Sequence, residues 1–99
     1  MIYKYTFTKR AAAQYREAVL WYVEKSILAG RNFDIELDEK IREICLHPTL
    51  YRNNVKKFRE ANLKYFPFTI VYKIDEKNHL VIITSIFHNK RNPKGKYTA

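Results

Sequence analysis

Two apolar runs separated by a short polar turn constrain the fold of this chain more than any other feature. The first run covers residues 66–74 and the second covers residues 80–87, and both are rich in the Ile, Val, Phe and Tyr side chains that favour strands. Residues 75–79 between them are polar or charged. The pattern therefore predicts a buried β-hairpin, with Pro67 at the start of its strand or at an edge, because proline cannot donate to a central ladder.

The first 30 residues predict a strand followed by a helix. Residues 2–7 alternate well enough for a strand, and the Thr8 hydroxyl is suited to cap a helix over residues 9–28. Gly30 would then end this helix in a left-handed conformation. The expected buried face holds Ala12, Tyr15, Val19, Tyr22, Val23 and Ser26, and the opposite face holds Arg16, Glu17, Glu24 and Lys25.

A second amphipathic helix is expected between Asn32, which can cap it, and His47, because Pro48 prevents further helix. Only a few residues separate the two helices, so they should form an antiparallel hairpin that lies on the sheet. Residues 47–54 are expected to form a loop, and residues 55–59 a short strand. The expected buried stripe of the second helix is Phe33, Leu37, Ile41 and Ile44.

Together these elements predict an α+β fold. Their order is an N-terminal strand, a helical hairpin and then an antiparallel sheet of three further strands, or β-α-α-β-β-β. A chain of 99 residues can bury one core, so residues 1–99 are expected to form a single domain.

Several classes of protein are excluded by composition. The one cysteine, Cys45, cannot form an internal disulfide, and we expect it to be buried in a reduced, cytoplasmic protein. No apolar run approaches the ~18 residues that a membrane span needs, and the first residues lack the apolar core of a signal peptide. His47, His79 and His88 show no metal-ligand spacing, and no glycine-rich phosphate loop is present, so neither metal nor cofactor is expected.

The net charge of +9 is distributed unevenly along the chain. Eight Lys and Arg side chains oppose seven Asp and Glu side chains in residues 1–49, whereas eleven oppose three in residues 50–99. A solvated basic surface would explain this excess. Its concentration in one half of the chain favours an anionic partner, either nucleic acid or an acidic protein.

Four segments, taken in order, carry a family resemblance. They are the helical hairpin ending in His47-Pro48, the pair Phe58-Arg59, the strand Tyr-Phe-Pro-Phe-Thr-Ile-Val-Tyr-Lys-Ile-Asp at 65–75, and the closing strand with His-Asn-Lys-Arg-Asn-Pro at 88–93. No segment is diagnostic alone, but the set spans nearly the whole chain and resembles the RelE/ParE superfamily of type II toxin–antitoxin toxins. The resemblance implies a small toxin that a cognate antitoxin neutralises by covering its cationic face or adding to a sheet edge.

The superfamily divides over its target. ParE-like members poison DNA gyrase, whereas RelE-like members cleave messenger RNA on the ribosome. In RelE-like enzymes a catalytic arginine lies three residues before the strand tyrosine that Tyr72 matches, and this chain has Thr69 there. Loss of one such donor costs about 2–4 kcal/mol of transition-state stabilisation. We therefore expect gyrase poisoning, with a ribosome-dependent mRNA endoribonuclease and a non-toxic nucleic-acid-binding domain as alternatives.

Candidate site residues differ between these functions. If the chain cleaves RNA, the catalytic candidates are His88, Arg91 and Arg59, because proton transfer suits an imidazole and charge stabilisation suits arginine. A strand-end surface role for His88 and an ion pair of Arg59 with Glu60 are the alternatives. We expect the cations to gather at one rim of the sheet beside the His88 imidazole. The candidates for binding an anion or a partner are Lys56, Lys57, Lys64, Lys90, Tyr97, Tyr51 and Arg52, although surface charge, an ordinary turn or a chain end would also explain them.

Overall fold

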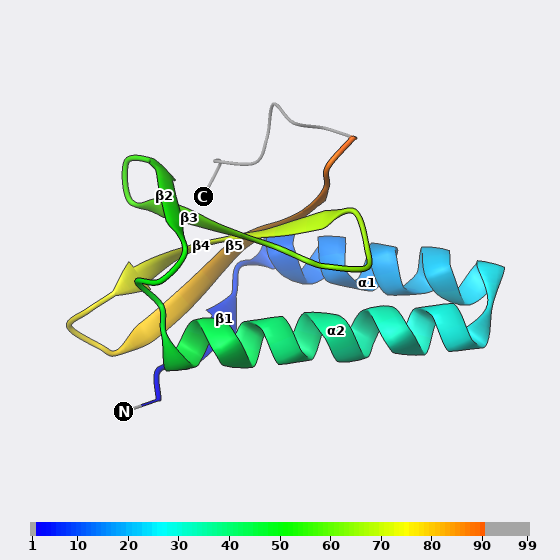
Figure 1. The fold of residues 1–99 in the computed structure, drawn as a ribbon, viewed down its shortest axis with the longest axis horizontal. Coiled ribbons are helices and arrows are strands. Elements are labelled where there is room, and N and C mark those ends of the chain that lie inside the picture. The colour runs from blue at the N-terminus through cyan, green and yellow to red at the C-terminus, as the bar shows by residue number, and fades with distance from the viewer. Residues whose placement is uncertain (1, 91–99) are drawn as a thin grey trace.

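The computed structural model describes residues 2–90, except for the side chains of Asn54 and Val55. Within these residues the α+β class, the helical hairpin and the order of strand, two helices and further strands are confirmed, although four strands rather than three follow the hairpin (Figure 1). The strands form one five-stranded sheet in the order β1-β5-β4-β3-β2. The elements are β1 (Lys4–Phe7), α1 (Lys9–Lys25), α2 (Ile27–Leu46), β2 (Arg52–Val55), β3 (Phe58–Asn62), β4 (Phe68–Asp75) and β5 (Leu80–His88).

The hairpin of β4 and β5 is the centre of the sheet, as the two apolar runs predict. β4 pairs antiparallel with β5 from Phe68 to Asp75. β1 runs parallel to β5 but reaches only the segment Leu80–Ile83, so the sheet is mixed. Among the described residues, the second half of β5 consequently has no strand beside it on the β1 side.

The connection after α2 differs from the sequence prediction. Residues 52–55, expected in a loop, form β2, which pairs antiparallel with β3. The single strand expected over residues 55–59 is instead divided: residue 55 ends β2, Phe58 begins β3, and Lys56 and Lys57 form the turn between them, where Lys56 has a positive φ of 52°. The sequence of β2 is polar because it lies at the edge of the sheet, and it therefore lacks an apolar strand signal.

The boundary between the two helices also differs. α1 ends at Lys25, and Ser26 is both its C-cap and the N-cap of α2, where the Ser26 hydroxyl accepts a backbone amide of the first turn at 3.2 Å. Gly30 and Asn32 lie inside α2, so the predictions that they end one helix and cap the next are wrong. A Cβ on Gly30 would lie 2.3 Å from Val23 Cγ2, so this glycine allows the close approach of the helices rather than a stop.

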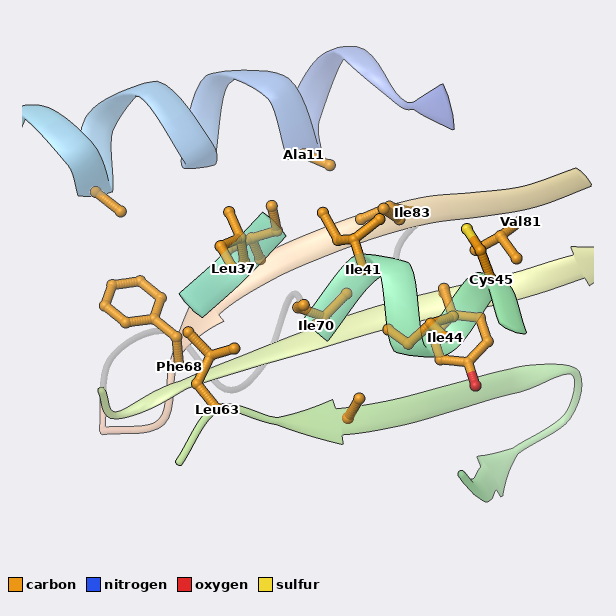
Figure 2. Packing of buried hydrophobic residues seen from close by; sticks show 14 of the residues in the cluster. Ala11, Leu37, Ile41, Ile44, Cys45, Leu63, Phe68, Ile70, Val81 and Ile83 are labelled. Atoms are coloured by element: carbon orange, nitrogen blue, oxygen red, sulfur yellow. The ribbon is translucent and has the colours of Figure 1, made fainter. Parts of the chain in front are cut away.

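Both helices bury one side against the sheet. The predicted stripe of α2 is confirmed, and Cys45 is buried beside it as expected. The fully buried residues of α1 are Ala11 and Ala18, whereas Val23, expected inside, is 39% exposed because it lies near the tip of the hairpin. Figure 2 shows the α2 side chains packed between α1 and the strands, with Leu37, Ile41, Ile44 and Cys45 near Ile70, Val81 and Ile83.

The tip of the helical hairpin extends beyond the strands (Figure 1). Several apolar side chains are therefore exposed there, including Leu20, Ile27 and Leu28. Neither α1 nor α2 combines the length and the apolar character that crossing a membrane requires.

Candidate functional site

Four cations converge on a polar cavity of about 700 Å³ at one end of the sheet, beside the turn between β2 and β3. Of these, Lys56, Lys57 and Arg59 are predicted candidates. The fourth, Lys73 of β4, was not predicted, although a lone cation in an apolar strand is the signal that would have found it. We call this surface the turn site, and its residues are Thr49, Asn53, Lys56, Lys57, Arg59, Lys73, Asp75 and Glu76.

Arg59 is positioned by the backbone rather than by a carboxylate. Its Nη1 donates to the Tyr51 carbonyl at 2.8 Å and to the Thr49 carbonyl at 3.3 Å. It lies opposite Tyr72 in the register of β3 and β4. Burial raises the pKa of Tyr72, whose hydroxyl donates to the Pro48 carbonyl at 2.6 Å, and the Arg59 charge partly opposes that rise. Arg59 and Tyr72 together hold the segment between α2 and β2 against the sheet.

Tyr51 and Arg52, expected as exposed anchors, both have partners. The Tyr51 hydroxyl donates to the Glu43 carboxylate of α2 at 2.8 Å, and burial together with this bond raises the pKa of Tyr51 to about 12. Lys40 lies over the Tyr51 ring. Arg52 is exposed and lies 3.7 Å from the Glu60 carboxylate. Tyr51 therefore links the loop to α2, and Arg52 remains a surface cation.

The turn site is suited to binding an anion rather than to moving a proton. No histidine lines it, and within residues 2–90 the imidazole of His88 lies at the opposite end of β5. Hydrogen bonds from Asn78 hold the pKa of Asp75 below its ordinary value, so this carboxylate is a weak base. Lysine and arginine side chains around an open polar cavity instead stabilise negative charge.

His88 and Lys90 lie away from the turn site. His88 pairs with Phe68, whereas Arg59 pairs with Tyr72, and the four-residue offset along β4 corresponds to about 13 Å. The expectation that the cations share one rim with the imidazole is therefore wrong. The reason is the strand register, which places Arg59 and His88 near opposite ends of the β4–β5 hairpin.

The remaining candidates are dispersed. Lys64 lies in the connection between β3 and β4, where its backbone amide donates to the Glu36 carboxylate and its Nζ lies 5.2 Å from the centroid of the Tyr65 ring. Arg91 and Tyr97 lie outside the described residues.

Thr69 lies near the His88 end and is buried, with 2% of its surface exposed. Its hydroxyl contacts the side-chain oxygens of Asn62, at 2.6 Å, and Asn89. This position, which carries a catalytic arginine in RelE-like enzymes, therefore holds a neutral side chain whose hydroxyl is already bonded within the sheet.

A second surface runs along the helices. Three adjoining cavities of about 300, 520 and 400 Å³ form it, the first sharing Tyr15 and Asp34 with the second, and the second sharing Asp38 and Arg42 with the third. Sequence reasoning did not predict this surface. We call it the hairpin groove, and its residues include Ile2, Tyr3, Tyr5, Tyr15, Val19, Leu20, Asp34, Ile35, Asp38, Arg42 and Leu46.

The hairpin groove and the turn site are adjacent. Tyr3 lines the groove, and its hydroxyl donates at 2.8 Å to the carboxylate of Glu76, which lines the turn site. The groove therefore ends beside a carboxylate that also lines the turn site.

The family model described as the ParE toxin of the type II toxin–antitoxin system parDE matches residues 5–93. No curated protein matches the chain.

Solved structures with a similar fold come from toxin–antitoxin systems. The intact RelBE complex of E. coli aligns at 17% identity with a TM-score of 0.69, covering 90% of this chain and 99% of that chain. The chromosomal ParDE system of P. aeruginosa aligns at 19% with a TM-score of 0.68, covering 88% and 96%. The RelBE2 complex of Mycobacterium tuberculosis aligns at 15% with a TM-score of 0.62, covering 89% and 99%. These likenesses establish the fold alone, and RelE and ParE structures match it equally well.

Proposed function

This chain belongs to the ParE toxin family of type II toxin–antitoxin systems, and we propose that it inhibits bacterial growth by binding DNA gyrase through the turn site. A cognate antitoxin would neutralise it by occupying the hairpin groove and covering the lysines. Binding requires complementary charge and shape, and no proton transfer by the toxin.

The observation that carries this proposal is the division of chemical groups between the two ends of the sheet. The turn site has cations without an imidazole. The other end has His88, but Thr69 stands there in place of a strand arginine. RNA cleavage without a metal would need both groups at one phosphate, since one activates the attacking oxygen and the other stabilises the developing charge. Among residues 2–90, no histidine lines the turn site, and His79 of the nearby β4–β5 turn packs against the Tyr3 ring instead. Beside His88 the strand position holds the neutral Thr69, and the neighbouring cation is Lys90.

The adjacency of groove and turn site supports the antitoxin part of the proposal. An amphipathic helix can place apolar side chains against Val19, Leu20 and Leu46, and a following acidic segment can pass Tyr3 to reach Lys56 and Lys57. The same cations would then serve the target in the free toxin and the antitoxin in the complex, which makes the two partners mutually exclusive.

Induced expression in a bacterium tests the gyrase proposal. We expect growth arrest with gyrase-linked DNA breaks and unchanged transcript ends. The double variant Lys56→Glu, Lys57→Glu should relieve the arrest, because like-charge contacts at an interface cost several kcal/mol. The matched control is Arg31→Glu, which reverses an exposed charge on α2 away from the turn site.

Other outcomes point to the alternative functions. Codon-phased cuts in transcripts that disappear in His88→Ala would establish the endoribonuclease instead. Unaffected growth, together with an affinity for nucleic acid that falls steeply with salt, would establish a non-toxic nucleic-acid-binding domain.

A further inference from the structure

A further cavity, of about 380 Å³, lies where β1 stops short of the second half of β5. α1 takes the place of a strand along this edge, and the cavity opens between the two elements. We call it the edge cavity, and the residues that matter to its chemistry are Gln14, Glu17 and Trp21 of α1 and Phe87 and His88 of β5.

Gln14 fixes the inner wall of the edge cavity. Its side-chain oxygen accepts the backbone amide of Ile86 at 2.8 Å and the Ser85 hydroxyl at 3.2 Å. Since the oxygen is the atom that accepts these two bonds, the other terminal atom of the side chain is the amide nitrogen, which carries two hydrogens. Within residues 2–90 no acceptor takes those hydrogens. Gln14 therefore supplies donors at a fixed place on the wall.

His88 also lines the edge cavity. Its Nδ1 accepts the backbone amide of Lys90 at 3.1 Å, so the neutral ring carries its hydrogen on Nε2. Its ring is also fixed edge-to-face against Phe68, with centroids 5.2 Å apart. Glu17 is the acidic residue of the cavity, and within the described part of the chain its carboxylate has no ion-pair or hydrogen-bond partner.

Aromatic surface and flanking cations complete the edge cavity. Trp21, 44% exposed, and Phe87 present ring surface to it. The Lys25 ammonium lies 4.9 Å from the centroid of the Trp21 ring, and Arg10 lies one helical turn before Gln14 on the same side of α1. Rings that stack on a base, beside cations that attract its phosphates, are the pattern of nucleotide binding.

We propose that the edge cavity binds a purine base, with guanine preferred over adenine, from either a free nucleotide or a single strand. Guanine presents two neighbouring N–H donors that match the Glu17 carboxylate, and the acceptor O6, which matches the hydrogens of the Gln14 side-chain amide. Adenine places an acceptor where guanine has one of those donors, which would repel Glu17. The volume lies in the range of small-ligand sites. This inference is independent of the toxin's target.

Trp21 is the only tryptophan of the chain, so its fluorescence reports on this cavity alone. The experiment titrates the purified full chain with GMP, AMP, CMP and a short guanine-containing oligonucleotide and measures tryptophan fluorescence. The same titration of free tryptophan corrects for the light that the nucleotides absorb. We expect GMP to quench the fluorescence saturably at concentrations roughly tenfold lower than AMP does. A tenfold ratio of dissociation constants corresponds to a difference of about 1.4 kcal/mol in binding free energy, which is the scale of one net hydrogen bond. Saturable quenching by the oligonucleotide but not by the mononucleotides would also support the site, and would indicate that the base belongs to a single strand rather than to a free nucleotide.

Two variants test the assigned contacts. Glu17→Gln should remove the preference for GMP over AMP, whereas Glu24→Gln, an exposed acid of α1 outside the cavity, should keep it. Phe87→Leu should weaken all purines alike, and circular dichroism confirms that each variant is folded. The proposal is overturned if no nucleotide quenches saturably at millimolar concentration, if Glu17→Gln keeps the GMP preference, or if an arginine-containing peptide quenches where nucleotides do not.

Discussion

The two ends of the β4–β5 hairpin carry different chemistry on one rigid support. The turn site gathers four cations around an open polar cavity, and it is assembled from the ends of strands, two turns and the segment after α2. The edge cavity has aromatic walls, one carboxylate and fixed donors, and it is built on a helix and a central strand. Cations therefore line the turn site, whereas they only flank the edge cavity. Charge attracts a large anionic partner from a distance, whereas a shaped cavity selects a small flat group.

The two ends also differ in what fixes them. At the edge cavity, the side chain of Gln14 replaces a missing strand by bonding the backbone of β5. At the turn site, Arg59 and Tyr72 bond the carbonyls of the segment between α2 and β2. The edge cavity should therefore be the more rigid end, since both partners of its bonds lie within regular elements, whereas the carbonyls bonded at the turn site lie in a connecting segment. Substitutions should cost more stability at the edge cavity.

The largest expected effect comes from Gln14→Leu. The backbone amide of Ile86 and the Ser85 hydroxyl lose their acceptor, and leaving buried donors without a partner should lower the free energy of unfolding by about 2–3 kcal/mol. Urea denaturation measures this change. Gln14→Glu keeps an acceptor and should cost less than half as much. Equal losses in the two variants would show that the bond to β5 does not support this end.

Arg59→Met tests the turn site in the same way. Its carbonyl partners at Tyr51 and Thr49 lie near the surface and can bind water instead, so we expect a smaller loss of about 1–2 kcal/mol in urea denaturation. Arg59→Lys keeps the charge but lacks the fork that reaches both carbonyls, and it should lose nearly as much. Full stability of Arg59→Lys would indicate that Arg59 acts through charge alone.

The elements that support the two ends differ in how readily the sequence predicts them, and the helix boundary was harder to predict than the buried stripe or the hairpin. The stripe of Phe33, Leu37, Ile41 and Ile44 and the β4–β5 hairpin follow from periodicity, because burial imposes a period that the sequence displays. Gly30 misled the prediction of the helix boundary, because a glycine needed for close helix packing looks like a glycine that ends a helix. The Ser26 cap was the correct signal.

The sites were less predictable than the fold, because strand register is not visible in a single sequence. Lys56, Lys57 and Arg59 were predicted as candidates, but only the pairing of Arg59 with Tyr72 and of His88 with Phe68 reveals that they lie far from the imidazole. The edge cavity was missed altogether. Glu17 was assigned to the solvated side of its helix, and nothing local in the sequence shows that β1 ends early and leaves a gap for it.

Alkaline pH should act on the turn site through Tyr51. Its pKa is raised from 10.0 to about 12 in the folded protein, so the neutral phenol contributes stability that is fully present below pH 10 and lost as pH rises through 12. Thermal denaturation between these values should show a decline that is shallower in Tyr51→Phe, which cannot ionise. Tyr65→Phe, which removes a hydroxyl from an exposed ring, is the control. Parallel declines in wild type and Tyr51→Phe would contradict this role.

The smallest expected effect concerns Lys56, in the turn between β2 and β3, where one substitution should change stability and growth inhibition in opposite directions. Lys56 has a φ of 52°, a left-handed conformation that costs a lysine more than a glycine. Lys56→Gly removes this strain but adds freedom to the unfolded chain, so we expect a net gain of about 0.5 kcal/mol in the free energy of unfolding. Because the same substitution removes a cation, growth inhibition should weaken while stability rises. Lys57→Gly, in the neighbouring turn position without positive φ, should weaken inhibition and lower stability. If Lys56→Gly lowers stability as much as Lys57→Gly does, the left-handed conformation of Lys56 has no energetic consequence.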